Sequence, residues 1–344
     1  MRFLLTLILF ALAGSATAQN TEQAHAYMQT IGNQFYQISN DRMSYTSAAS
    51  HGKSARKVEK KRTELINTIK MAEANIRKMK PFNGSAAYRD SVVAYLKLNR
   101  IVLTEDYGKI LDMEEIAEQS YDAMEAYMLA KEKAEEKLDV AFEKVSEQQK
   151  LFASTNNIKL VESDSKLSEK LETSGKVFTY YNPVYLIFFK SYKDEMYMLD
   201  AIGRNDVNAM EQTKNALLAN VEKGMAALGP MAAYKGDNSL KVACQQLLSF
   251  YKMEASQKMS EIINFQLKQD NYEKMKAAMD AKRPADRTKQ DVDEFNKMVN
   301  EYNVSVGRIN ALQNELNKKR TEALNRWNEA TENFLDKHIP KYRG

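Results

Sequence analysis

The chain has 344 residues, of which 44% are hydrophobic and 28% charged, with only 12 glycines and 5 prolines. These proportions exclude disordered, collagen-like and disulfide-scaffold chains, and the length exceeds what one hydrophobic core usually serves, so we expect two domains. The formal net charge of +4 is too small to indicate a polyanionic partner, and nucleic-acid binding is not expected.

Residues 1–18 have the pattern of a secretory signal peptide. Arg2 supplies the positive charge, residues 3–13 form an apolar stretch too short to span a bilayer, and Ala16-Thr17-Ala18 is a small-x-small cleavage site. We therefore expect export and cleavage before Gln19. The mature protein is expected in the periplasm, on the cell surface or outside the cell, without a transmembrane segment.

Apolar residues at three- and four-residue spacing predict a first bundle of long helices over residues 19–153. The expected helices are 22–45, 53–80, 86–118 and 120–153. The third has a clear stripe, interrupted by Asn99 and Asp106 and formed by Val92, Leu96, Leu103, Ile110, Met113 and Ala117. Stripes of this kind are typical of helices that pack nearly antiparallel in a bundle.

A basic cluster stands at the start of the second expected helix, and its members are Lys53, Arg56, Lys57, Lys60 and Lys61. Most of them fall on one helical face, which Glu59 interrupts and Glu64 follows. Clustered cations bind polyanions, so this face is a candidate site for lipid headgroups, lipopolysaccharide or acidic polysaccharide. Ordinary solvation of an exposed helix is the favoured alternative.

The polar run 154–174 breaks the seven-residue repeat, and we expect a linker between the domains over residues 154–180. The second domain is expected over 181–344, with helices at 184–202, 206–228, 239–269 and 285–337. Asn182 and Pro183 are the expected N-cap and first residue of its first helix. The last helix has the most regular stripe of the chain, with Gln313 and Arg320 as its two polar positions.

The two halves of the chain share short patterns. Residues 121–131 match residues 272–282 at six of eleven positions. The set Ala72, Ile76, Met79 and Pro81 has the same spacing as Val221, Met225, Leu228 and Pro230. We therefore predict an all-α fold of two tandem, duplicated antiparallel bundles with about four long helices each. Coincidence between two Met- and Ala-rich helices is the alternative.

Several of these residues also resemble a known family. The signal peptide combined with Tyr181-Asn182-Pro183, Leu228-Gly229-Pro230, Tyr234-Lys235-Gly236 and Phe250-Tyr251-Lys252 is similar to a family of secreted surface proteins of bacteroidetes and leptospires. The resemblance covers mainly residues 181–340. It implies an extracytoplasmic helical protein without an established activity, and it nominates no catalytic residue.

Residues that usually carry chemistry are sparse. His25, His51 and His338 are far apart and lack the spacing of ligand pairs on a helix. The acidic residues between Asp112 and Glu118 are expected to form a solvated face. Cys244, the single cysteine, stands among apolar residues and is expected to be a core thiol. We therefore predict no enzyme activity, catalytic residue, cofactor or metal site.

The aromatic run from Tyr180 to Tyr192 is expected to pack inside the second bundle rather than to anchor a partner. The predicted function is a non-enzymatic structural or interaction protein of the cell envelope, whose partner is another envelope protein or a second copy of the chain. The alternative is a binder of polyanions or lipid surfaces that acts through the basic face at residues 53–62.

Overall fold

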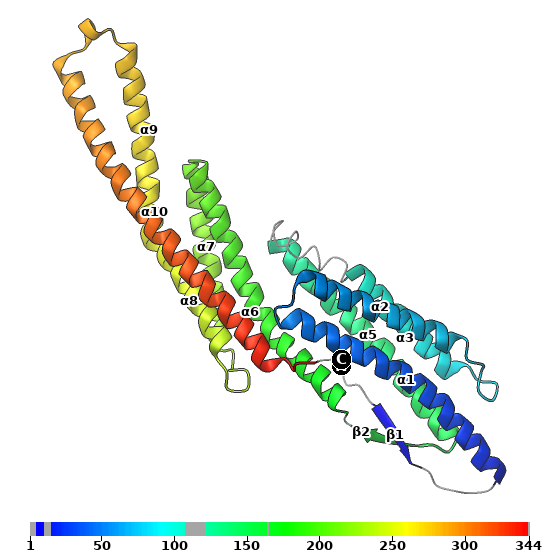
Figure 1. Ribbon diagram of the computed structural model, residues 1–344. Helices are drawn as coiled ribbons and strands as arrows, with labels where there is room; N and C mark the ends of the chain where they lie inside the picture. Colours follow the sequence, from blue (N-terminus) through cyan, green and yellow to red (C-terminus); the bar gives the residue numbers. More distant parts are fainter. Residues whose placement is uncertain (1–4, 10–14, 107–120, 164, 343–344) are drawn as a thin grey trace. The chain divides into compact units, whose positions relative to one another are not determined.

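The computed structural model describes residues 5–9, 15–106, 121–163 and 165–342 (Figure 1). Within these ranges the protein is all-α apart from one short two-stranded sheet, as the periodicity predicts. The chain forms two compact units. Unit 1 contains the described residues up to Thr179 together with 332–342, and unit 2 contains residues 180–331.

Unit 1 is a bundle of long helices, in order α1 (Ser15–Ser50), α2 (Ala55–Arg77), α3 (Ala87–Ile101) and α5 (Tyr121–Thr155). A π-helix, η1 (Val102–Asp106), continues α3. The sheet pairs β1 (Leu5–Leu9) antiparallel with β2 (Lys159–Ser163), so that Leu7 lies opposite Val161. The bounds of α2, the start of α3 and the end of α5 agree with the expected ones to within a few residues, whereas α1 is longer at both ends. The expected end of the third helix at residue 118 and the expected start of the fourth at residue 120 lie outside the described residues.

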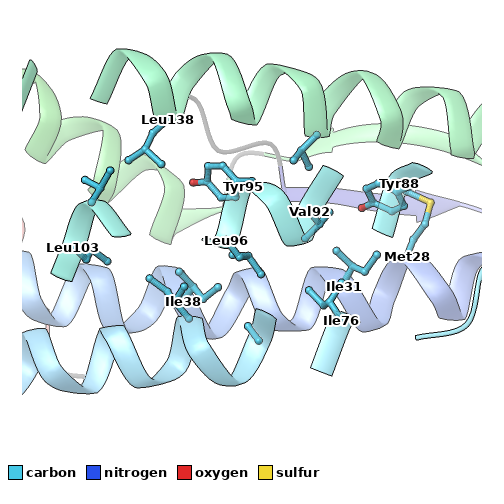
Figure 2. Close-up of a cluster of buried hydrophobic side chains, with 14 of the residues drawn as sticks. Met28, Ile31, Ile38, Ile76, Tyr88, Val92, Tyr95, Leu96, Leu103 and Leu138 are labelled. Carbon is cyan, nitrogen blue, oxygen red and sulfur yellow. The ribbon is translucent and has the colours of Figure 1, made fainter. Parts of the chain in front are cut away.

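The core of unit 1 lies between these helices (Figure 2). Ile31 and Ile38 of α1 face the interior together with Leu96 of α3 and Leu138 of α5, and each is at most 3% exposed. Burial of one such aliphatic side chain contributes about 1.5–3 kcal/mol. The apolar stripes that predicted the helices are therefore the surfaces that hold unit 1 together.

Unit 2 contains the second part of α6 (Lys166–Gly203), followed by α7 (Val207–Leu228), α8 (Ser239–Met253), the π-helix η3 (Glu254–Lys258), α9 (Met259–Ala281), the short 3₁₀ turn η4 (Pro284–Asp286) and α10 (Lys289–His338). α8, η3 and α9 follow one another without interruption. Trp327 of α10 is 2% exposed and stacks on Phe188 of α6, with 4.5 Å between the ring centroids.

The expected boundary between the domains differs from the observed one. The expected linker over 154–180 holds β2 and the start of α6, and Pro183 lies inside α6 instead of at its first turn, so the predicted helix start is wrong. Proline inside a helix removes one backbone donor, so the usual local preference for a helix start does not decide the course of α6 here.

The C-terminal residues belong to unit 1, not to the second domain in which we expected them. The backbone N–H of Tyr342 donates to Ser47 Oγ at 3.1 Å, and the Lys170 ammonium lies 5.2 Å from the centroid of the Tyr342 ring. Ile339 is also 2% exposed. These contacts hold the end of the chain against α1.

The two units repeat an order of elements with matching lengths. α3 and α8 have 15 residues each, and each continues into a five-residue π-helix. Val207 lies 152 residues after Ala55, and Ser239 lies the same distance after Ala87. Both units also have a tight turn before the third helix, with positive φ at Asn83-Gly84 and at Lys235-Gly236. Glycine adopts such φ values without a steric penalty.

Side-chain contacts recur in the same places. Each unit has a carboxylate that accepts a hydrogen bond between its first two helices, an aromatic pair beside the tight turn, and a cation that donates to a backbone carbonyl. In unit 1 these are Thr68–Asp41 at 2.6 Å, Tyr27–Phe82 at 5.5 Å and Arg89–Met79 at 2.7 Å. In unit 2 they are Asn220–Asp194 at 2.6 Å, Tyr180–Tyr234 at 5.4 Å and Lys241–Met231 at 2.7 Å.

The recurring contacts match residues of unit 1 with residues of unit 2 differently from the match that the short sequence patterns gave. Met79 has the role of Met231, whereas the spacing of the prolines aligned it with Leu228. Residues 121–131 begin α5, but residues 272–282 lie at the end of α9. The tight turns at Asn83 and Lys235 lie 152 residues apart, and this offset differs from the one that the Met- and Ala-rich segments gave.

Candidate functional site

Three charged residues from distant parts of the chain meet in unit 2, two of them buried and the third half-buried, and we call them the Glu–Arg–Glu cluster: Glu195, Glu254 and Arg320. Glu195 lies on α6, Glu254 is the first residue of η3, and each is 1% exposed. Arg320 of α10 donates from Nε to Glu195 and from Nη2 to Glu254. Its Nη1 donates to Asn317 of the same helix.

The cluster contains two carboxyl groups for one guanidinium. Burial raises the pKa of Glu254 to about 8, because desolvation and the charge of Glu195 outweigh the attraction of Arg320. Burial also raises the pKa of Glu195, although Arg320 opposes the shift. The second carboxyl oxygen of Glu254, Oε2, is buried without a hydrogen-bond partner among the described residues, which also disfavours a charge on this group. The cluster therefore holds one proton and has no net charge near neutral pH.

A tyrosine flanks the cluster. Tyr251 of α8 is fully buried, and the charge of Glu195 acts on its hydroxyl group. Burial and the nearby carboxyl groups raise the pKa of Tyr251 far above its ordinary value, so this residue stays protonated. The site thus combines proton-holding groups with a fixed cation.

The described residues contain no group of three or more His, Cys, Asp or Glu side chains arranged to hold a metal ion. His51 Nδ1 lies 2.8 Å from Asp336 Oδ1, whereas the ring of His338 packs beside Phe334. The acidic segment 112–118 lies outside the described residues.

The structure divides the predicted basic cluster into two sets. Lys53, Arg56 and Lys57 are exposed at the N-terminal end of α2, and no ion pair with a carboxylate is found for them among the described residues. Lys61 and Lys60 both approach Glu64, at 2.8 and 3.9 Å. Glu64 therefore compensates one of the two charges of the second set, while the first turn of α2 has no acidic residue.

Two other candidate residues belong to the core. Cys244 is fully buried, and burial raises the pKa of its thiol to about 12, so the reactive thiolate is not formed at ordinary pH. Phe188 and Phe189 of the aromatic run are also buried. Both observations agree with the core role expected for these residues.

The Glu–Arg–Glu cluster was not predicted from the sequence. One signal pointed to it: Arg320 occupies an apolar position of the most regular stripe in the chain. A charged residue at such a position needs a buried partner. The partners could not be named, because Glu195 and Glu254 lie 125 and 66 residues away.

Among the helices in the described ranges, none combines the length and the apolar character needed to cross a bilayer. The chain matches no protein-family model, no curated protein and no solved structure.

Proposed function

We propose that this chain is a non-enzymatic structural or interaction protein of the bacterial cell envelope, which binds its partner through helical surfaces. The observation that carries the proposal is a two-helix arm in unit 2, formed by residues 261–308 of α9, η4 and α10. The arm extends beyond the turn between α6 and α7 (Figure 1). Its outer faces are therefore open to a partner.

The arm has its own internal contacts. Tyr272 stacks on Tyr302 with 4.4 Å between the ring centroids, and Phe265 stacks on the same Tyr302 ring at 5.9 Å. Arg308 pairs with Glu261 at 2.8 Å where the arm begins. Contacts of this kind keep two antiparallel helices together without a third layer.

Apolar side chains remain on the outside of the arm. Val304 is 75% exposed, Leu267 46% and Val292 38%. Exposed apolar residues on a projecting element are typical of interaction surfaces, although single ones are common on any protein. Two partners fit such a surface, another envelope protein and a second copy of this chain.

Export is part of the proposal. The charged start, the apolar stretch and the small-x-small site of residues 1–18 support it, and so does the resemblance to secreted surface proteins. Cleavage after Ala18 would remove β1 and leave α1 starting at Gln19. The partner would then be met in the periplasm or at the cell surface.

The experiment places a photo-cross-linking amino acid at Val304 of the chain expressed in its own cell envelope. The matched control carries it at Val140 of α5, which is 66% exposed in unit 1. The proposal expects a specific cross-linked product from position 304 and none from position 140. Recovery of monomer alone from both positions, at all protein levels tested, would contradict it.

The alternative function is binding to a polyanion or an anionic lipid surface. The observation that favours it is the position of Lys53, Arg56 and Lys57, exposed at a helix N-terminus where the helix dipole is also positive. Such an uncompensated cationic end attracts phosphate or carboxylate groups.

The alternative is tested by co-sedimentation with anionic vesicles at low salt. The variant K53Q/R56Q/K57Q should lose binding, whereas the matched variant K60Q/K61Q, whose cations are already paired with Glu64, should retain most of it. Equal retention of the wild type and the triple variant would dispose of this function.

We also propose that the units arose by duplication. A common origin explains the recurring turn, π-helix and hydrogen bonds better than coincidence does. Asp41 and Asp194, for example, make the same contact between the first two helices of their units, although the donor residues differ. Chimeric chains in which the α2–α3 segment is replaced by the α7–α8 segment would test this origin, because a segment in its corresponding position should still pack as helices. If the chimeras fold at none of the alignments tried, coincidence is the better explanation.

A further inference from the structure

The Glu–Arg–Glu cluster is not needed to form a π-helix. In unit 1 the corresponding π-helix begins at Val102, which lies 152 residues before Glu254 and is 7% exposed. An apolar residue therefore occupies the same position in a π-helix that still forms. Because apolar replacements of buried ion pairs are often neutral or stabilising, the stability of the π-helix does not account for the charges of the cluster.

The cluster joins three segments that have no covalent connection nearby. Arg320 is the only cation bonded to the two glutamates in the described residues, and it holds α10 against both α6 and η3. With both carboxyl groups ionised the site would carry one net negative charge in the interior. A single shared proton removes that charge and lets both carboxyl groups remain bonded to Arg320.

We propose that the Glu–Arg–Glu cluster is a proton-dependent latch at the start of the two-helix arm. While Glu195 and Glu254 share a proton, Arg320 holds α10 against α6 and η3. Loss of the proton leaves an uncompensated buried charge, and α10 separates from α6. The latch is independent of the proposed partner binding, and its test does not require a partner.

The titratable groups around Glu254 are placed as the latch requires. α6 contributes Glu195, α8 contributes Tyr251, and α10 contributes Arg320. α7 and α9 also pack against η3. On α7 Glu211 is bonded to Lys214 and Glu222 pairs with Lys252 of α8, and on α9 Glu261 pairs with Arg308. Within the cluster, Tyr251 and Arg320 keep their protons throughout the neutral range, so Glu195 and Glu254 are the groups that respond.

The direction of the pH response follows from the raised pKa of Glu254. The unfolded chain releases this proton near the ordinary pKa of 4.5, and the native chain keeps it up to about pH 8. The stabilisation is therefore complete below about pH 4.5 and is lost as the pH rises through about 8. The latch is closed in acid and at neutral pH, and it opens in mildly alkaline solution.

The chain contains its own reporter of this contact. Trp327 is the only tryptophan, and it lies two helical turns after Arg320 on the same helix. It is 2% exposed and stacks on Phe188 of α6. Separation of α10 from α6 exposes the indole to water, which shifts its emission to longer wavelengths.

The experiment follows the tryptophan emission of the full chain between about pH 5 and pH 9, with far-UV circular dichroism on the same samples. The proposal expects a red shift with a midpoint near about pH 8 while the helical signal is retained. The E254Q variant cannot ionise and should show no transition. The control E222Q changes a carboxylate on α7 whose side chain is 63% exposed, and it should titrate like the wild type.

Constant emission of the wild type over this range would overturn the proposal. So would an unchanged transition in E254Q. If the E254Q variant loses its helical signal, the E254V variant is used in its place, because valine at this position copies Val102 of unit 1. Constant emission of the wild type, or an unchanged transition in E254V, would then overturn the proposal.

Discussion

Gly224 lies in α7 where three helices of unit 2 approach one another closely. A Cβ at this position would lie 2.8 Å from Cγ2 of Ile187 on α6 and 3.2 Å from Cδ1 of Leu248 on α8. Carbon atoms pack best at about 3.5–4.0 Å, so G224A must push neighbouring helices apart by several tenths of an ångström. Helix propensity alone would instead favour alanine by about 1 kcal/mol.

The two effects have opposite signs, and their sizes decide the outcome. Overpacking of a tight core typically costs about 1–3 kcal/mol, so we expect G224A to lower the free energy of unfolding by about 1 kcal/mol net. The matched control is G307A, in the interior of α10, where no atom lies within 4 Å of the new methyl group. There we expect a gain of about 0.5–1 kcal/mol.

Urea denaturation followed by tryptophan emission and circular dichroism measures both variants against the wild type. I187L should restore much of the loss in the G224A background, because leucine lacks the branch at Cβ that supplies Cγ2. The reasoning is refuted if G224A is stabilised as much as G307A, since the close approach of Ile187 would then carry no cost.

Three further predictions concern the core, the arm and the N-terminus. W327A should lower the free energy of unfolding of unit 2 by about 3–5 kcal/mol, because it removes a buried side chain that stacks on Phe188. Thermal unfolding followed by circular dichroism measures the loss, and a loss below about 1 kcal/mol would contradict the packing. T288A should destabilise the arm by about 0.5–2 kcal/mol, because Thr288 and Asp291 cap the start of α10 reciprocally. The backbone N–H of Asp291 donates to Thr288 Oγ1 at 3.1 Å. Hydrogen exchange over residues 288–295 measures the effect, and unchanged protection would refute this prediction. Mass spectrometry of the protein from envelope fractions should find Gln19 at the N-terminus, and an intact Met1 would exclude the predicted cleavage.

Most of the helical architecture could be predicted from the sequence for a local reason. The spacing of apolar residues records which face of each helix is buried, and this signal lies within one segment. The stripe through Ile309, Leu316, Ala323 and Phe334 is buried as expected. The bounds of α2 and α7 and the start of α8 also agree with the expected ones to within a few residues. The helix that begins at Ser239 was expected to end at 269, whereas it continues through η3 and α9 to Ala281.

The errors arose where distant contacts override local preference. Pro183 has the usual place of a helix start, yet α6 continues through it. Residues 332–342 follow directly on unit 2 in the chain, but hydrogen bonds to α1 place them in unit 1. The short patterns shared by the two halves aligned them at another offset than the tight turns do, because Met- and Ala-rich helices fit several alignments.

By itself the sequence determined the helical class, the division into two halves and the absence of familiar catalytic motifs, because each of these depends on residue spacing along the chain. Only the tertiary structure brought Glu195, Glu254 and Arg320 together, through a π-helix and two other helices. The physical reason is that a buried charge is compensated in space, and its partners are not constrained to any spacing in the sequence.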